Sequence, residues 1–154
     1  MCLRLSGLYW RGRSNAAAVE MRLNEIVSAR LPPAFDGFSV LHLSDLHADM
    51  SGGAMQRVAE LAAQVSYDLC VLTGDYRAAT SGPYEPCLRE LQRLRVALRG
   101  DVYAVLGNHD TILMAPDLER MGVRVLLNES AALERGNSKI FLAGVDDAHF
   151  LQGR

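Results

Sequence analysis

The sequence predicts one α/β domain built on a parallel sheet. Three short apolar stretches suited to buried strands alternate with two segments whose apolar residues recur at helical spacing. The order strand, helix, strand, helix, strand indicates right-handed crossovers between neighbouring parallel strands. A length of 154 residues with 49% apolar content is sufficient for one core, and a second full domain does not fit.

The elements of this βαβαβ core begin after the turn-forming residues between 32 and 37. Each strand is a short apolar run, and each helix has an apolar stripe with polar residues on its other face. The expected elements are a strand at 38–44, a helix at 55–65, a strand at 68–73, a helix at 88–98 and a strand at 102–106.

Further elements are expected on both sides of the core. Apolar and polar residues alternate over 19–23, which predicts an early edge strand. Downstream, the sequence predicts a short helix at 116–121 and strands at 123–127 and 140–143, with a hairpin-type turn at 136–137.

The N-terminal residues 1–18 combine arginines with leucines, Tyr9 and Trp10. A terminus packed at the edge of the fold is favoured over contact with a membrane surface, because lipid-binding helices need a longer amphipathic face. No apolar run approaches the roughly 20 residues of a membrane-spanning helix. We therefore divide the chain into this N-terminal segment and one domain at 19–154.

Charge and cysteine content restrict the partners and the compartment. A formal net charge of -2 and a pI near 6.1 argue against nucleic-acid binding, which needs concentrated positive charge. Cys2, Cys70 and Cys87 form no CxxC pair and cannot all be bridged, which favours a reducing compartment. We expect a cytoplasmic protein, with peripheral attachment to the inner face of the membrane as the alternative.

Residue types that bind metals follow each of the three core strands. Because the carboxyl ends of parallel strands meet at one edge of a sheet, these side chains are expected to form one site. The residues are Asp45 and His47 after the first strand, Asp75 after the second, and Asn108, His109 and Asp110 after the third.

Carboxylate and imidazole together suit Mn, Fe or Zn. Asp75 on the central strand is placed to bridge two ions, and Asn108 offers an amide oxygen to the second. Two ions about 3.5–4 Å apart can activate water for attack at phosphorus. His109 can then stabilise the phosphoryl oxygens or protonate the leaving group, with Asp110 orienting its ring.

At these residues the sequence resembles the calcineurin-like metallophosphoesterases, whose motifs are DxH, GD, GNH[DE], a lone His and GHxH. The first three motifs are present at 45–47, 74–75 and 107–110. Flanking residues 44–47, 73–76 and 143–147 are similar to a bacterial, often membrane-associated branch. Some members of that branch cleave the pyrophosphate of UDP-diacylglucosamine, so a phosphorylated small molecule or a lipid-linked substrate is expected.

The resemblance implies an α/β/β/α sandwich, of which this chain supplies most of the first sheet and the start of the second. It also assigns roles to single residues of the site. By this assignment Asp45 and His47 bind the first metal ion, Asp75 bridges, Asn108 binds the second, and His109 is catalytic with Asp110 as its partner.

The later motifs of the family are absent after Asp110. His149 fits neither the lone-histidine nor the GHxH context, so we expect it not to be a ligand. The expectation is a phosphoesterase domain truncated at its carboxyl end, whose missing half another chain can supply. The alternative is a non-catalytic fragment that binds a metal or a partner.

Three further residues are expected to have structural roles. His42 alternates with Leu41 and Leu43, so it is expected on the opposite face, packed or hydrogen-bonded. Cys70 lies within a strand and is expected in the core. Cys87 has no basic neighbour that would activate its thiol.

Overall fold

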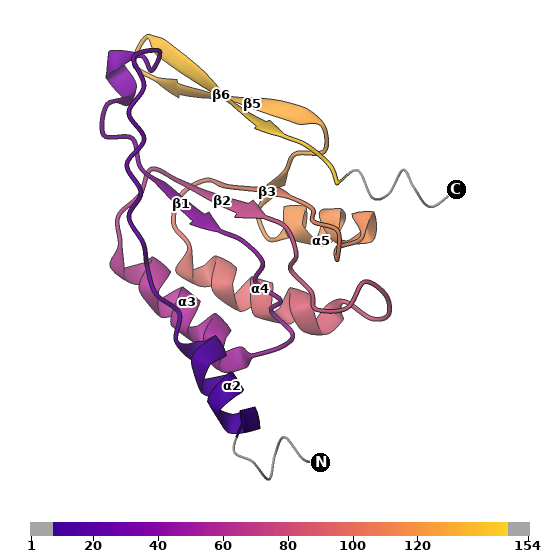
Figure 1. Cartoon of the computed structure of the whole chain (residues 1–154). Helices are drawn as coiled ribbons and strands as arrows, with labels where there is room; N and C mark the ends of the chain where they lie inside the picture. The colour runs from indigo at the N-terminus through magenta and orange to yellow at the C-terminus, as the bar shows by residue number, and fades with distance from the viewer. Residues whose placement is uncertain (1–7, 148–154) are drawn as a thin grey trace.

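The structure, a computed structural model, describes residues 8–147 (Figure 1). A four-stranded sheet carries helices on one face and a β-hairpin on the other. In chain order the elements are α2 (Leu8–Ala17), η1 (Pro33–Phe35), β1 (Val40–Leu43), α3 (Gly52–Gln64), β2 (Leu69–Thr73), α4 (Glu85–Ala97), β3 (Val102–Val105), η2 (Ile112–Met114), α5 (Ala115–Arg120), β4 (Arg124–Val125), β5 (Glu129–Arg135) and β6 (Ser138–Gly144).

The four-stranded sheet has the order β1-β2-β3-β4, and every neighbouring pair is parallel. Helix α3 connects β1 to β2, and α4 connects β2 to β3. The predicted βαβαβ core is therefore confirmed, with element bounds that differ from the expected ones by a few residues. The carboxyl ends of β1, β2 and β3 lie side by side.

The two core helices form where the sequence pattern predicts them. Helix α3 begins after Ser51, whose hydroxyl accepts a hydrogen bond from the Ala54 N–H at 3.3 Å and so caps the helix. Both helices turn apolar side chains toward the sheet, namely Met55, Val58 and Ala62 from α3 and Cys87, Leu91 and Leu94 from α4.

Successive side chains of each strand point to opposite faces of the sheet, and each face has its own core cluster. On the helix side, Cys70, Leu72 and Ala104 are fully buried in the larger core cluster. On the hairpin side, Leu69 and Tyr103 belong to a second, smaller cluster. The helix side therefore contains most of the described core.

The hairpin-type turn at 136–137 is confirmed, but the strand directly before it, β5, was not predicted. It joins β5 to β6, which pair antiparallel, and Gly136 adopts a φ of 61° there. The sequence Ser-Ala-Ala in β5 has weak strand propensity, which explains the omission. The strand expected at 123–127 is reduced to β4, which pairs with β3.

The predicted edge strand at 19–23 is wrong for the described chain. The segment is not assigned to a strand, and Leu23, Ile26 and Val27 are largely exposed. An extended segment becomes a strand only when its backbone groups pair with a neighbour, and this segment has no such neighbour within residues 8–147. The N-terminal segment instead forms α2, which contacts α3.

No helix among residues 8–147 has both the length and the apolar character needed to cross a bilayer.

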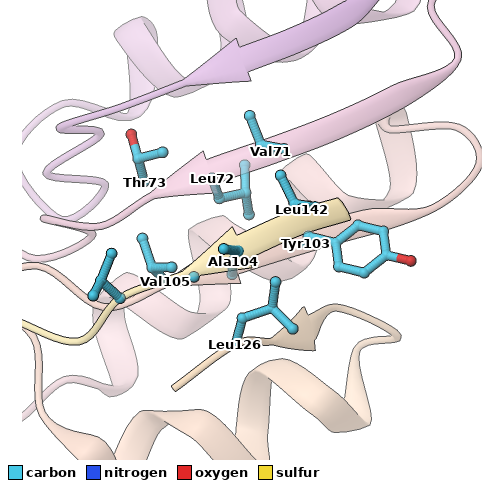
Figure 2. A pocket seen from close by; sticks show the side chains of 11 residues that line it. Val71, Leu72, Thr73, Tyr103, Ala104, Val105, Leu126 and Leu142 are labelled. Atoms are coloured by element: carbon cyan, nitrogen blue, oxygen red, sulfur yellow. The ribbon is translucent and has the colours of Figure 1, made fainter. Parts of the chain in front are cut away.

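An apolar cavity of about 260 Å³ lies between the parallel sheet and β6 (Figure 2). Val71 and Val105 of the sheet face it from one side and Leu142 of β6 from the other. On the same face of the sheet, the side chain of Val40 is half exposed. The described residues thus leave the hairpin side of the sheet only partly covered.

Candidate metal centre

The loops that follow β1 and β2 run side by side, because backbone hydrogen bonds join them beyond the sheet. The N–H of Asp45 donates to the Gly74 carbonyl at 3.2 Å, and the N–H of His47 donates to the Asp75 carbonyl at 3.0 Å. The N–H of Ala48 then donates to the Tyr76 carbonyl at 2.6 Å. These bonds hold the first two motifs next to each other.

Three of the motif residues have unusual backbone conformations. Asp45, His47 and Asp75 have φ values of 52°, 37° and 52°, in the left-handed region that non-glycine residues rarely adopt. Each such conformation costs on the order of 1 kcal/mol and persists only where surrounding contacts enforce it. The interloop hydrogen bonds supply those contacts.

The glycines of the second and third motifs are required by their close approach. A Cβ atom on Gly74, whose φ is 85°, would overlap the backbone of Gly107. A Cβ atom on Gly107 would overlap the carboxylate of Asp75. Only glycine at both positions lets the two loops come together.

The structure brings Asp45, His47 and Asp75 together, with one possible ligand atom from each residue within 4.8 Å of the others. His47 Nδ1 lies 2.8 Å from the Arg77 carbonyl oxygen. Because a carbonyl can only accept, Nδ1 carries the proton and Nε2 is left with its lone pair for a metal ion. Two carboxylates and one imidazole nitrogen fit a divalent ion such as Mn²⁺, Fe²⁺ or Zn²⁺.

His109 lies beside this cluster. The centroids of the His109 and His47 rings are 5.2 Å apart at an interplanar angle of 72°. His109 Nδ1 lies 2.8 Å from the Ala78 carbonyl oxygen, so it is the donor, and the Nε2 atom is free to face a substrate. The backbone N–H of His109 also donates to Asp75 Oδ1 at 3.1 Å.

Asn108 is exposed in the same loop, directly before His109. Its position at the end of β3 is the one expected for an additional amide-oxygen ligand. The ligand group of Asp45, His47 and Asp75 does not itself include it.

Asp110 does not orient the His109 ring as expected. Its carboxylate is almost fully buried, where Oδ1 accepts from the Tyr76 N–H and Oδ2 from the Gly107 N–H, both at 2.9 Å. Burial raises the pKa of Asp110, while these N–H groups act in the opposite direction. Asp110 therefore connects the second and third loops, and the Ala78 carbonyl takes the place expected for Asp110 on the imidazole.

The sequence analysis missed Tyr76 and Arg77, which follow the second motif directly. The Tyr76 hydroxyl is buried and contacts the carbonyl oxygens of Leu72 at 3.1 Å and Val105 at 2.6 Å. Burial raises the pKa of this phenol. Arg77 is also buried. The only signal in the sequence is a cationic residue immediately after Gly74-Asp75-Tyr76, too little to predict burial.

The residues expected to be structural behave as predicted. His42 faces away from Leu41 and Leu43, and its Nε2 is 2.8 Å from the Thr73 hydroxyl. Cys70 and Cys87 are buried free cysteines, and burial raises the pKa of each thiol to about 12. His149 lies outside the described residues.

Two comparisons with known proteins agree with this site. A sequence model of the family described as "Calcineurin-like phosphoesterase" matches residues 38–149. The protein "Uncharacterized metallophosphoesterase YkoQ" of Bacillus subtilis (strain 168) is 32% identical over 124 residues, which cover 75% of this chain and 45% of that protein. The chain thus spans less than half the length of this curated relative. The family match over most of the chain, with the three motifs assembled at one sheet edge, shows that the chain belongs to the calcineurin-like phosphoesterase family.

Proposed function

We propose that this chain is part of a metal-dependent phosphoesterase that hydrolyses a phosphomonoester, phosphodiester or pyrophosphate bond. The observation that carries the proposal is the ligand cluster of Asp45, His47 and Asp75 at the carboxyl edge of the sheet. Family membership and the position of His109 beside the cluster support it.

Asp45 and His47 would hold one divalent ion, Asn108 a second, and Asp75 both. When bound, the two ions supply a hydroxide nucleophile and neutralise charge on the phosphoryl group. His109 has its Nδ1–H fixed on the Ala78 carbonyl, so its ring orientation is set before substrate arrives. When the ring is protonated at Nε2 as well, that N–H can donate to a phosphoryl oxygen or give its proton to the leaving oxygen, while Nδ1–H stays on the Ala78 carbonyl.

The complete centre needs ligands beyond those of this chain. The resemblance to the family implies a lone histidine and a GHxH motif, and the 154 residues contain neither after Asp110. We propose that downstream sequence or a second chain supplies them. An ion held by three side chains and water binds more weakly than one in a complete site, so the 154 residues alone are expected to hydrolyse little substrate.

The substrate class within this proposal is a phosphorylated small molecule or a lipid-linked pyrophosphate, as in the bacterial branch that residues 44–47 and 73–76 resemble. A lipid-linked substrate would bring the protein to the inner face of the membrane without a spanning helix. Nucleic acid is not expected, since the formal net charge is -2.

The proposal is tested first by metal binding to this chain, followed by the electron paramagnetic resonance of Mn²⁺. Asp75→Asn removes a ligand charge at constant size and is expected to weaken Mn²⁺ binding by about tenfold or more. Asp68→Asn is the matched control, because Asp68 precedes β2 at the opposite end of the sheet. Equal Mn²⁺ binding by the parent and Asp75→Asn would contradict the proposed centre.

Activity provides the second test. The chain alone is expected to show negligible hydrolysis of p-nitrophenyl phosphate or its bis-ester with Mn²⁺. Turnover that Asp75→Asn or His109→Ala abolishes would overturn the proposed need for further ligands. A histidine and a GHxH motif encoded downstream of Arg154 would support a truncated enzyme, and their absence would favour the non-catalytic metal- or partner-binding fragment.

A further inference from the structure

Arg77 is a buried cation whose partners are all backbone carbonyls. Its side chain is 4% exposed, and its guanidinium donates to the oxygens of His109 at 2.5 Å, Gly82 at 3.0 Å and Thr80 at 2.6 Å. No carboxylate forms a salt bridge with it among residues 8–147. Burying a charge is costly unless it is hydrogen-bonded, and here three of the five guanidinium N–H donors bind carbonyl oxygens.

The same residue is connected to both site histidines through the backbone. The Arg77 carbonyl accepts from His47 Nδ1, and the next carbonyl along the chain, that of Ala78, accepts from His109 Nδ1. The guanidinium also binds the carbonyl of His109 itself. The Arg77 side chain thus links two parts of the site: the segment 77–78, whose carbonyls accept from both histidines, and the loop that carries His109.

The position of this segment is not set by Arg77 alone. The Ala78 N–H donates to Asp49 Oδ1 at 2.8 Å, which connects it to the loop after β1. The Ala78 N–H and the Arg77 carbonyl belong to one planar peptide unit, so that bond also holds the carbonyl that accepts from His47. Beyond Ala78, the carbonyls of Thr80 and Gly82 are tied to the third loop through the guanidinium. Loss of the guanidinium is therefore expected to free the Ala78 carbonyl, which accepts from His109, and not the Arg77 carbonyl, which accepts from His47.

From these contacts we propose that Arg77 is a positioning residue that fixes the tautomer and orientation of His109. The arrangement selects the Nδ1–H tautomer in each ring, which leaves each Nε2 for the site. Arg77 is buried and binds three backbone carbonyls, so it acts on the proposed site only through His109. The link to the proposed site rests on the proposed function, whereas the effect on the tautomer does not.

Arg95 offers a matched comparison within the same chain. Its guanidinium also donates to backbone carbonyls, at 3.1 Å to Leu98, 3.5 Å to Gly100 and 3.4 Å to Gly122. These residues lie before β3 and β4, at the amino edge of the sheet and away from the motifs. Arg95→Met therefore removes a carbonyl-binding arginine without touching either histidine.

The primary experiment is nitrogen-15 NMR of the histidine side chains in the metal-free chain, with His42→Gln and His149→Gln to assign the signals. In the parent chain we expect His47 and His109 in the Nδ1–H tautomer. Arg77→Met is expected to give the His109 ring a mixture of tautomers while His47 keeps the Nδ1–H form, and Arg95→Met to leave both rings unchanged. Arg77→Lys keeps one cationic donor group and is expected to restore the tautomers in part.

The second measurement is Mn²⁺ affinity, which is expected to be retained in Arg77→Met, because the Ala78 N–H–Asp49 bond still holds the carbonyl that orients the ligand His47. Unchanged tautomers in Arg77→Met would overturn the proposal, even if thermal stability falls as in Arg95→Met. If Arg77→Met does not fold, parent-like tautomers in a folded Arg77→Gln would overturn it equally. A tautomer change without Mn²⁺ binding by the parent would support the positioning role and contradict the proposed function.

Discussion

The two faces of the parallel sheet differ in how completely they are packed. On the helix side, strand residues such as Cys70 and Leu72 are sealed beneath α3 and α4. On the hairpin side, Val71 and Val105 border an apolar cavity of about 260 Å³, and Val40 is half exposed. Adjacent residues of one strand thus meet different surroundings, and the helix side supplies the larger part of the packing that stabilises the described fold.

The largest expected difference is in thiol reactivity, which probes access to each face. In a Cys2→Ser background, Cys70 and Cys87 should resist a disulfide reagent at about pH 8, because their raised pKa leaves little reactive thiolate. Val71→Cys places a thiol one residue along β2 on the cavity side. Its modification is expected to be about a thousandfold faster, measured by the absorbance of the released thiol reagent.

The control for this prediction is the unfolded chain, in which all three thiols should react at similar rates. Comparable rates for Cys70 and the Val71→Cys thiol in the folded protein would show that the helix side is no better sealed than the hairpin side.

Core truncation is expected to give the next largest difference. Leu94 is fully buried in α4, so Leu94→Ala should lower the free energy of unfolding by about 2–5 kcal/mol through lost burial and a new void. Leu142→Ala beside the existing cavity removes fewer contacts and should cost about 1 kcal/mol. Urea denaturation measures both, and equal losses would contradict the contrast between the two faces.

The smallest effect on stability is expected for Asp68, which directly precedes β2 at the amino edge of the sheet. Asp68 Oδ2 accepts from the N–H and hydroxyl of Ser39 at 2.8 and 3.0 Å, and these bonds lower the pKa of Asp68. A lowered carboxyl pKa contributes stability above the unfolded-state pKa of about 3.9, and this is lost as pH falls through the folded value. Because Asp68 is exposed, Asp68→Asn should cost less than about 1 kcal/mol.

The measurement for Asp68 is the difference in unfolding free energy between parent and variant as a function of pH. The difference should be present near neutrality and vanish on acidification. A difference that instead grows toward low pH would show that the Ser39 contact does not stabilise the charged carboxylate.

The parallel core was predictable because its signals are local. Strands such as β2 are compact apolar runs, and α3 and α4 have apolar residues at helical spacing. The fate of residues 19–23 was not predictable in this way, since an alternating segment becomes a strand only where a partner is present. The strand β5 was missed for the opposite reason, because pairing with β6 overrides its weak propensity.

The candidate site was predictable in its ligands but not in the groups that hold them. Asp45, His47 and Asp75 have residue types and positions that indicate a metal site, and the structure brings them together. The acceptors for the two imidazoles are the carbonyls of Arg77 and Ala78, and a backbone carbonyl has no signature in sequence. For this reason the sequence analysis expected Asp110, the carboxylate next to His109 in the sequence, to orient the His109 ring, whereas the Ala78 carbonyl does so.

The contact between Gly74 and Gly107 has a consequence for how this chain tolerates mutation. Neither residue offers a functional group, yet any side chain at Gly107 would displace the Asp75 carboxylate, and any at Gly74 would separate two loops. In a saturation mutagenesis survey, these two positions are expected to be as intolerant as the ligands themselves. Variants there are expected to lose Mn²⁺ binding while retaining the helix-side core, because the added side chain displaces the ligand loops without removing a ligand.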